Sequence, residues 1–465
     1  MSKSNRVMDR VRKNMCILIT TFWTDRNKGD ASLNIAIIRF IRKIFPEASI
    51  IVCSVYGANQ FDLIERELYL TKREDIDSII GNVFPTYHRL DRRLSSRGIT
   101  RKFLYALRAM LTVGFAILIL VAACLKLAKI IAYILPREFK RSLETFLSAD
   151  IIISRRSVIP SAINAGLNML TIMVEPYILF KSLYDMFLAI ALRKPLIIIG
   201  CSIWPLVNPI SKILLRWVLN RCGLIVVREE FSYNYIRTQL KIRNKNLYIL
   251  PDLAIFLYGE NKWQQKPYPR SKVKQIIGFT FVDWYAYGLN KRENYIQVMA
   301  NIIKFIKENY DAEIIVIPQV TYSPEDPYDI ARLIVAKSGV NVKIIHEELT
   351  LDELLKLYSS CDFVIATPVH SAILSLVVGT PVIAIAYDDG FKHIGIMKMF
   401  GMERYVLPFY FLNLQSLIKT FNEAWLNRVK LHNDALRSTR ILLSSIDTFV
   451  PFLQKFIRKN LRYSG

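Results

Sequence analysis

The sequence predicts an α/β fold of two Rossmann-like, doubly wound domains, and three observations support this prediction. Short runs of Ile, Val and Leu, bounded by turn residues, recur along the chain. Runs of about four to eight apolar residues are typical of parallel strands that helices cover on both faces. Helical stretches separate the runs, and a polar segment with two prolines divides them into two sets. A chain of 465 residues is long enough to bury two cores.

Strands are expected on both sides of the polar segment. The first set covers residues 16–21, 49–55, 149–154, 195–201, 224–227 and 247–250. The second set covers residues 276–281, 313–318, 342–345, 363–366 and 381–386. Gly29 and Asp30 open the first helix, and a capping box from Thr350 to Glu353 opens a later one. Strands and helices that alternate this regularly predict two parallel sheets.

The two sets define an N-terminal domain over residues 15–260 and a C-terminal domain over 275–411, joined by a linker over 261–274. A helical tail over 412–465 is expected to follow them. Doubly wound sheets bind ligands at the carboxyl ends of their strands. Two such domains facing each other form a glycosyltransferase-B-like architecture, so we expect the active site in the cleft between them.

The charge of the chain indicates an anionic partner. Lys and Arg number 63 against 39 Asp and Glu, which gives a formal net charge of +24. Nucleic acid is not expected, because the chain has no zinc-knuckle, RNP-type or helix-turn-helix signature. Anionic lipid headgroups or phosphorylated substrates are favoured, and a solvated basic surface is the alternative.

The cysteines and histidines indicate a cytoplasmic protein without a metal site. The six cysteines have no CxxC spacing, so we expect reduced thiols. The five histidines are not paired with acids at ligand spacing. The apolar run over residues 15–22 is short and precedes Asn-Lys-Gly-Asp, and it is expected to form the first strand and no signal peptide.

Residues 101–141 interrupt the α/β pattern with an apolar helical insertion. The run over 109–125 holds 17 residues without a charge, and several Lys and Arg flank it. A spanning helix needs about 20 apolar residues, so this run is marginal. Three alternatives remain: a hairpin buried in the protein or between subunits of a homo-oligomer, a segment lying in the lipid interface, and a true span. The flanking cations favour the second, which makes the protein peripheral or monotopic at an anionic cytoplasmic membrane surface.

His370 is the first candidate for catalysis. The apolar run 363–366 ends shortly before it, and a helix is expected to begin there. This position lies at the carboxyl edge of the sheet, where ligands bind, and the ordinary pKa of histidine suits proton transfer near neutrality. A histidine that caps or packs is the alternative.

Seven segments, in chain order, resemble motifs of the polysaccharide pyruvyl transferase family. They are NKGD at 27–30, GCSIWP at 200–205, VREEFS at 227–232, PD at 251–252, IPQ at 317–319 with Asp326 and Asp329, His370, and YDDGFKHIGIMKMFG at 387–401. The resemblance implies an enzyme that moves the enolpyruvyl group of phosphoenolpyruvate onto two hydroxyls of a glycan or lipid-linked sugar. The product is a cyclic ketal, phosphate is released, and phosphoenolpyruvate is the donor substrate with no further cofactor.

The resemblance also implies roles for single residues. His370 is the general acid, and Arg228 and Lys392 bind the anionic groups of the donor. Substrate-binding roles at the cleft are implied for Asn27, Gly29, Asp30, Ser202 and Gln319. The alternatives are an ion pair of Arg228 with Glu229 or Glu230, a solvated Lys392, and an Asp30 that caps a helix.

The chain departs from the family pattern near its central motif. Pro368 stands where the family has an arginine before its histidine, and Trp204 replaces a glycine. Arg155 and Arg156 stand where the family has a glycine-rich turn. We hypothesise that these two arginines bind substrate and restore the cations lost at Pro368.

Two other functions stay open because of these departures. A nucleotide-sugar glycosyltransferase can use the same architecture, although the helix after His370 has no glutamate pair to hold a nucleotide. A non-catalytic member of the family, acting as a membrane-associated scaffold in glycan assembly, is the second alternative.

Overall fold

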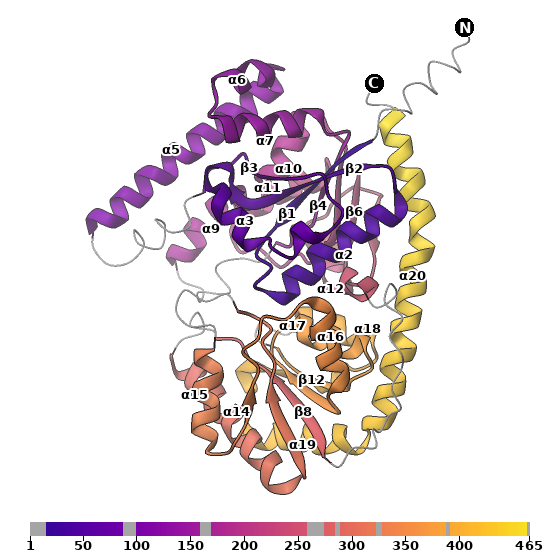
Figure 1. The fold of residues 1–465 in the computed structure, drawn as a ribbon. Coiled ribbons are helices and arrows are strands. Elements are labelled where there is room, and N and C mark those ends of the chain that lie inside the picture. The colour runs from indigo at the N-terminus through magenta and orange to yellow at the C-terminus, as the bar shows by residue number, and fades with distance from the viewer. Residues whose placement is uncertain are drawn as a thin grey trace.

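Two parallel β-sheets, each covered by helices on both faces, organise the protein (Figure 1). The computed structural model describes residues 15–86, 99–158, 169–257, 274–283, 289–321, 328–386 and 391–462. The strand order is β3-β2-β1-β4-β5-β6-β7 in the N-terminal sheet and β10-β9-β8-β11-β12-β13 in the C-terminal sheet. All strand pairings in both sheets are parallel. The predicted fold class, two doubly wound α/β domains, is confirmed.

The N-terminal sheet alternates with helices along the chain. Its strands are β1 (Cys16–Phe22), β2 (Ser49–Gly57), β3 (Ser78–Asn82), β4 (Ile151–Ser154), β5 (Leu196–Cys201), β6 (Leu224–Val227) and β7 (Leu247–Ile249). Its helices are α2 (Lys28–Ile44), α3 (Phe61–Glu67), α5 (Ile99–Cys124), α6 (Ala128–Ile134), α7 (Arg137–Ser148), α9 (Met169–Ser182), α10 (Tyr184–Ala191), α11 (Pro209–Leu219) and α12 (Glu230–Asn234). Strand β3 was not predicted, because this short edge strand has only two large apolar residues.

Strand β1 shows how the sheet separates two hydrophobic layers. Side chains alternate between the faces of a strand. Ile17 and Ile19 therefore join the cluster that contains α2, whereas Leu18 joins the cluster on the other face with α5, α10 and α11. The layer around α2 continues into the C-terminal domain, so the two domains share one apolar core.

The C-terminal sheet follows the same plan. Its strands are β8 (Gln275–Thr280), β9 (Ala312–Val316), β10 (Lys343–Ile344), β11 (Phe363–Ala366), β12 (Val382–Ala386) and β13 (Val406–Pro408). Its helices are α14 (Leu289–Asn309), α15 (Asp329–Ser338), α16 (Leu351–Ser360), α17 (Val369–Val377), α18 (Phe391–Met399) and α19 (Leu414–Leu426). The capping box of α16 is present, and the edge strand β13 was not predicted.

The last helix, α20 (Arg428–Arg462), runs beside both sheets (Figure 1). The side-chain amide of Gln454 donates to the carbonyl of Ile44 at the end of α2, at 3.0 Å. The Tyr248 ring of β7 packs against Phe452, with 4.9 Å between the centroids. The predicted helical tail therefore ties the C-terminal domain back to the N-terminal one.

The apolar insertion 101–141 forms α5, α6 and the first residues of α7, and α5 holds its uncharged run. Its segment Leu107–Cys124 has a mean hydropathy of 2.3, so by length and composition it could cross a membrane, and 28% of this segment is buried in the protein. Ala116 and Ile119 are fully buried, and the Tyr184 hydroxyl of α10 donates to the Ala116 carbonyl at 3.0 Å. Most of the predicted linker 261–274, Asp326 and residues 387–390 lie outside the described residues.

Candidate active site

The candidate site lies where the carboxyl ends of the central strands of the two sheets meet. In the N-terminal sheet the strand order reverses between β1 and β4, and in the C-terminal sheet between β8 and β11. Such reversal points are where doubly wound sheets bind ligands. Gly29 follows β1, and His370 follows β11 as the second residue of α17. The two domains therefore bring these two residues together at their reversal points.

The first turn of α2 packs directly against the His370 imidazole. A Cβ added at Gly29 would lie 2.7 Å from Cγ of His370 and closer still to Nδ1. Glycine is required here because only a residue without Cβ permits this approach. Asn27 is the N-cap of α2, and its Oδ1 accepts from the Gly29 amide at 3.0 Å. Asp30 lies in the first turn and is not the N-cap, so the alternative proposed for it was wrong.

Arg228 and Asp252 form a buried ion pair that faces His370 from the N-terminal domain. Nη1 of Arg228 lies 2.6 Å from Oδ2 of Asp252, and the two side chains are only 2% and 1% exposed. Nε2 of His370 lies 3.4 Å from Nη1 of Arg228 and 3.8 Å from Oδ2 of Asp252. Ser202, after β5, accepts from Nε of Arg228 at 2.7 Å. Ser202 therefore positions Arg228.

The alternative ion pairs for Arg228 are not formed. Glu229 caps α12 by accepting from the Ser232 amide at 2.8 Å, and Glu230 pairs with Lys398 at 2.7 Å. Asp252 is the ion-pair partner of Arg228 in place of the two glutamates. From the sequence, Asp252 was placed in a motif but was assigned no role. Its position directly after β7, at the same sheet edge as the other site residues, was the signal that could have identified it.

Cations outnumber carboxylates around the imidazole. Burial lowers the pKa of His370 to about 3; the charges of Lys392, Arg228 and Arg155 also lower it, and Asp252 opposes them. The histidine is therefore neutral at physiological pH, unlike the ordinary histidine expected from the sequence. Lys392 is buried, so a solvated lysine was the wrong alternative.

The two carboxylates of the cluster respond differently to their surroundings. Burial raises the pKa of Asp30, although the charges of Arg155, Lys392 and Arg228 oppose the effect. Burial would also raise the pKa of Asp252, but the charge of Arg228, with the hydrogen bonds from Arg228 and the Ala254 amide, outweighs it and lowers that pKa overall. The cluster is net positive with either state of Asp30, and it suits an anionic ligand.

Arg155 joins this cluster, whereas Arg156 faces another carboxylate. Nη2 of Arg155 donates to the carbonyl of Thr21 at 2.9 Å and to Oδ1 of Asn34. Burial lowers the pKa of Arg155 to about 10, which leaves the side chain cationic at neutral pH. Burial also lowers the pKa of Arg156, and its main charge partner is Asp185. Of the two arginines, the structure brings Arg155 into the surroundings of His370.

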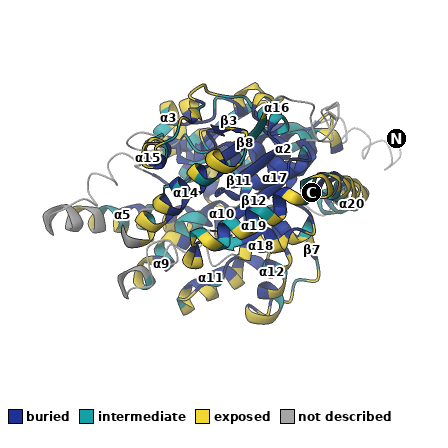
Figure 2. Cartoon of the chain, turned by 90° about the horizontal axis from the view of Figure 1, so that it is seen from below, coloured by how far each residue is buried: buried dark blue, intermediate teal, exposed yellow. Residues whose placement is uncertain are grey.

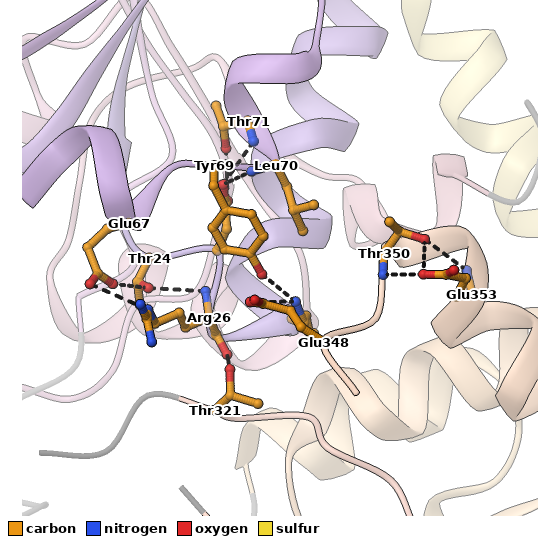
Figure 3. Close-up of polar contacts among 12 residues, drawn as sticks. Thr24, Arg26, Glu67, Tyr69, Leu70, Thr71, Thr321, Glu348, Thr350 and Glu353 are labelled. Atoms are coloured by element: carbon orange, nitrogen blue, oxygen red, sulfur yellow. Dashed lines mark hydrogen bonds and ion pairs between the residues drawn. The ribbon is translucent and has the colours of Figure 1, made fainter. Parts of the chain in front are cut away.

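Gln319 belongs to a seam of contacts that joins the two domains beside the site, and Figure 3 shows another part of this seam, where Thr321 meets Arg26. The Lys28 amide donates to the Gln319 carbonyl at 2.9 Å, and the Thr321 amide donates to the Arg26 carbonyl at 2.9 Å. Nζ of Lys28 lies 3.9 Å from Oε1 of Glu348 in the C-terminal domain. The seam therefore holds the N-terminus of α2, and with it Gly29, against the C-terminal domain. The predicted substrate contact of Gln319 stays a prediction.

The described residues contain no group of three or more His, Cys, Asp and Glu side chains that could hold a metal ion. The site is built from single residues on separate loops, with cations in excess. An α/β transferase fold of the glycosyltransferase-B kind, with a cationic site between its domains, is the class that these features define.

Comparisons with known proteins agree with this class. The polysaccharide pyruvyl transferase family model matches residues 27–389, and the chain belongs to this family. The match covers the segments that carry Gly29, Arg228, Asp252 and His370.

Solved structures show the same fold at low sequence identity. A glycosyltransferase from Rickettsia africae is 13% identical, with a TM-score of 0.52, and the match covers 97% of this chain and 98% of that one. A UDP-glucose:anthocyanidin 3-O-glucosyltransferase is 11% identical, with a TM-score of 0.51 and coverage of 96% and 100%. A UDP-N-acetylglucosamine 2-epimerase from Listeria monocytogenes, called putative, is 9% identical, with a TM-score of 0.50 and coverage of 94% and 96%. These likenesses establish the fold alone.

Proposed function

We propose that the protein transfers the enolpyruvyl group of phosphoenolpyruvate onto two hydroxyls of a glycan or lipid-linked sugar, as a cyclic ketal. The observation that carries the proposal is the His370 imidazole, held neutral in a net-positive cluster between the domains. Phosphoenolpyruvate has a carboxylate and a phosphate, and both need fixed cations. Arg228 and Lys392 would supply them, with Arg155 as the cation that replaces the family arginine lost at Pro368.

Donor binding would also convert His370 into an acid. In the free protein, burial and the three cations keep the imidazole neutral. A bound dianionic phosphate and a carboxylate would offset those cations, and opposite charges nearby raise the pKa of a histidine. The imidazole would then take up a proton in the donor complex and hold it for transfer. Asp252, which already opposes the cations, would help to stabilise the imidazolium.

In the proposed reaction, the His370 imidazolium protonates the methylene carbon of the donor, which becomes a methyl group. One sugar hydroxyl forms a C–O bond to the neighbouring carbon, and its proton returns to the imidazole. The bond from that carbon to the phosphate oxygen breaks as the second hydroxyl bonds to it, and the second proton leaves with inorganic phosphate. Arg228 and Lys392 would stabilise the phosphate as it departs.

The test measures phosphate released from phosphoenolpyruvate, with and without sugar acceptors that carry two free hydroxyls. We expect release that depends on acceptor and equals the amount of ketal found by mass spectrometry. Release of a nucleoside diphosphate from a nucleotide sugar, with no use of phosphoenolpyruvate, would replace the proposal with a glycosyltransferase. Binding of acceptor without either reaction would indicate a non-catalytic protein.

Gly29→Ala is expected to lower the turnover of this reaction by about 10²-fold. The new Cβ would force the imidazole or the first turn of α2 to move by about 1 Å, and a misplacement of that size has such an effect on a reacting group. Steady-state phosphate release measures the change. Gly114→Ala in α5 is the control, because a Cβ there meets no atom within 4 Å. Equal activity of the two variants would show that the Gly29 contact does not matter for turnover.

A further inference from the structure

Three helices of the N-terminal domain expose apolar side chains on the same side of the protein. Helices α5, α9 and α11 lie along one side in Figure 2, with α2 and α16 on the opposite side. The exposed apolar residues, called here the apolar face, are Leu104, Leu107, Met110, Leu111, Ile117, Leu118 and Val121 on α5, Met173, Val174 and Ile178 on α9, and Ile210, Ile213 and Trp217 on α11. Large exposed apolar side chains gathered on one side of a domain mark a protein or membrane contact.

The helices of the apolar face pack on a common support. Helix α10 contacts α5, α9 and α11, and its Tyr184 hydroxyl fixes α5 through the Ala116 carbonyl. On α11, Ile210, Ile213 and Trp217 follow one stripe of the helix, and the Trp217 ring stacks on Phe187 of α10 at 5.4 Å. The face is therefore assembled from segments far apart in the sequence that all pack on α10.

The charges around the apolar face have one sign. No Asp or Glu occurs in residues 92–137, which contain nine Lys and Arg, or in residues 186–227, which contain five. On α11, Lys212 and Arg216 are exposed beside the apolar stripe, and Arg221 stacks over Trp217 with 4.2 Å to the ring centroid. Glu175 of α9 is buried and accepts from the Asn208 amide, so it does not face solvent. Among the described residues of α5, α9 and α11, the charged side chains that reach solvent are cations, and an apolar surface with such charges matches an anionic lipid surface.

The apolar face begins beside the candidate site. The chain passes from β5 through Ser202 to α11, and Nδ2 of Asn208, the N-cap of α11, donates to the Ile172 carbonyl of α9 at 2.9 Å. In a parallel sheet, the helix after a strand begins near the carboxyl edge of that strand. The apolar stripes of α9 and α11 therefore start at the sheet edge that carries the site residues.

We propose that the apolar face docks on an anionic lipid bilayer, with α5 lying along the interface. A spanning α5 would have to leave α10, and it would expose Ile119 and break the Tyr184 hydrogen bond. A docked α5 keeps these contacts and places its exposed side in the lipid. The proposal goes beyond the proposed reaction and does not depend on it. Taken together, the two would allow a lipid-linked acceptor to reach the site from the bilayer.

Vesicle flotation of the full chain tests the proposal without any measurement of activity. The vesicles contain equal parts of phosphatidylcholine and phosphatidylglycerol, and vesicles of phosphatidylcholine alone are the second arm. We expect the protein to float with the anionic vesicles, less with the neutral ones, and less at raised ionic strength. Leu111→Glu with Ile213→Glu should reduce the partition into anionic vesicles by about tenfold or more, because both side chains leave the lipid and add negative charge.

The matched control is Leu426→Glu with Ile441→Glu, on α19 and α20. These side chains are also apolar and exposed, at 80% and 63%, and they lie outside the apolar face. The control should float like the unchanged protein, and circular dichroism should show both double variants folded. Equal flotation of the two variants, or no flotation of the unchanged protein, would overturn the proposal. A dimer that only Leu111→Glu with Ile213→Glu dissociates, without lipid binding, would assign the face to a second copy.

Discussion

His370→Gln is expected to lower the turnover of pyruvyl transfer by about 10²–10⁴-fold, the range that general acid catalysis contributes. Glutamine keeps the polar character and most of the volume of the side chain, but it cannot give a proton to the donor carbon. The Arg228–Asp252 ion pair and Lys392 remain, so we expect donor affinity to change much less than turnover. Steady-state phosphate release gives the turnover, and the quenching of intrinsic fluorescence by phosphoenolpyruvate gives the affinity.

A matching control uses Lys291→Gln, because Lys291 stacks over Tyr410 and is not among the residues of the site cluster. Its turnover should equal that of the unchanged protein. If His370→Gln also kept full turnover, the histidine would not be the acid of the reaction. A loss of donor affinity with unchanged turnover would assign it to binding alone.

The same His370→Gln variant also reports on the charge of the imidazole in the free protein. The pKa of His370 is about 3 in the folded protein and near 6.5 in the unfolded chain. Between these values only the unfolded chain binds the proton, so this residue lowers stability as the pH falls below 6.5. Between pH 7.5 and pH 5.5, His370 should lower the free energy of unfolding of the unchanged protein by about 1.4 kcal/mol. The glutamine variant should not show this part of the loss. Urea unfolding of both proteins at both pH values measures the difference. An equal loss of stability in the two proteins would show that the imidazole is already protonated in the folded protein at pH 5.5.

Asp252→Ala is expected to lower the free energy of unfolding by about 3–5 kcal/mol. The change leaves the Arg228 guanidinium buried without its counter-ion, and an unpaired buried charge is strongly destabilising. It also removes the cap of a short 3-10 helix, where Oδ1 of Asp252 accepts from the Ala254 amide at 3.0 Å. Urea unfolding followed by tryptophan fluorescence measures the loss.

The Lys398–Glu230 pair offers a control, because its N–O distance is similar to that of Arg228 and Asp252 but its side chains are exposed to solvent. Its N–O distance is 2.7 Å, against 2.6 Å for Arg228 and Asp252, but its side chains are 60% and 59% exposed. Glu230→Ala should therefore lower the free energy of unfolding far less than Asp252→Ala does, because solvent screens an exposed pair. Similar losses in the two variants would mean that Arg228 finds water or another partner when Asp252 is removed.

The fold class and the position of His370 at the sheet edge could be predicted from the amino-acid sequence. Apolar runs such as 363–366 predict buried parallel strands because their pattern is local and follows from the two covered faces of the sheet. A residue just after such a run must lie at the carboxyl edge, and that alone placed His370. The strands β3 and β13 were not predicted, because short edge strands carry few apolar residues and so show no clear apolar run.

The contacts that give His370 its chemistry were decided only by the tertiary structure. Gly29 lies against its ring, Asp252 replaces the glutamates that adjoin Arg228, and the apolar face combines three helices. The low pKa of His370 depends on burial and on charges from loops of both domains. Burial and charge act through distance in space, and the spacing of residues along a chain does not encode that distance until the two sheets have packed.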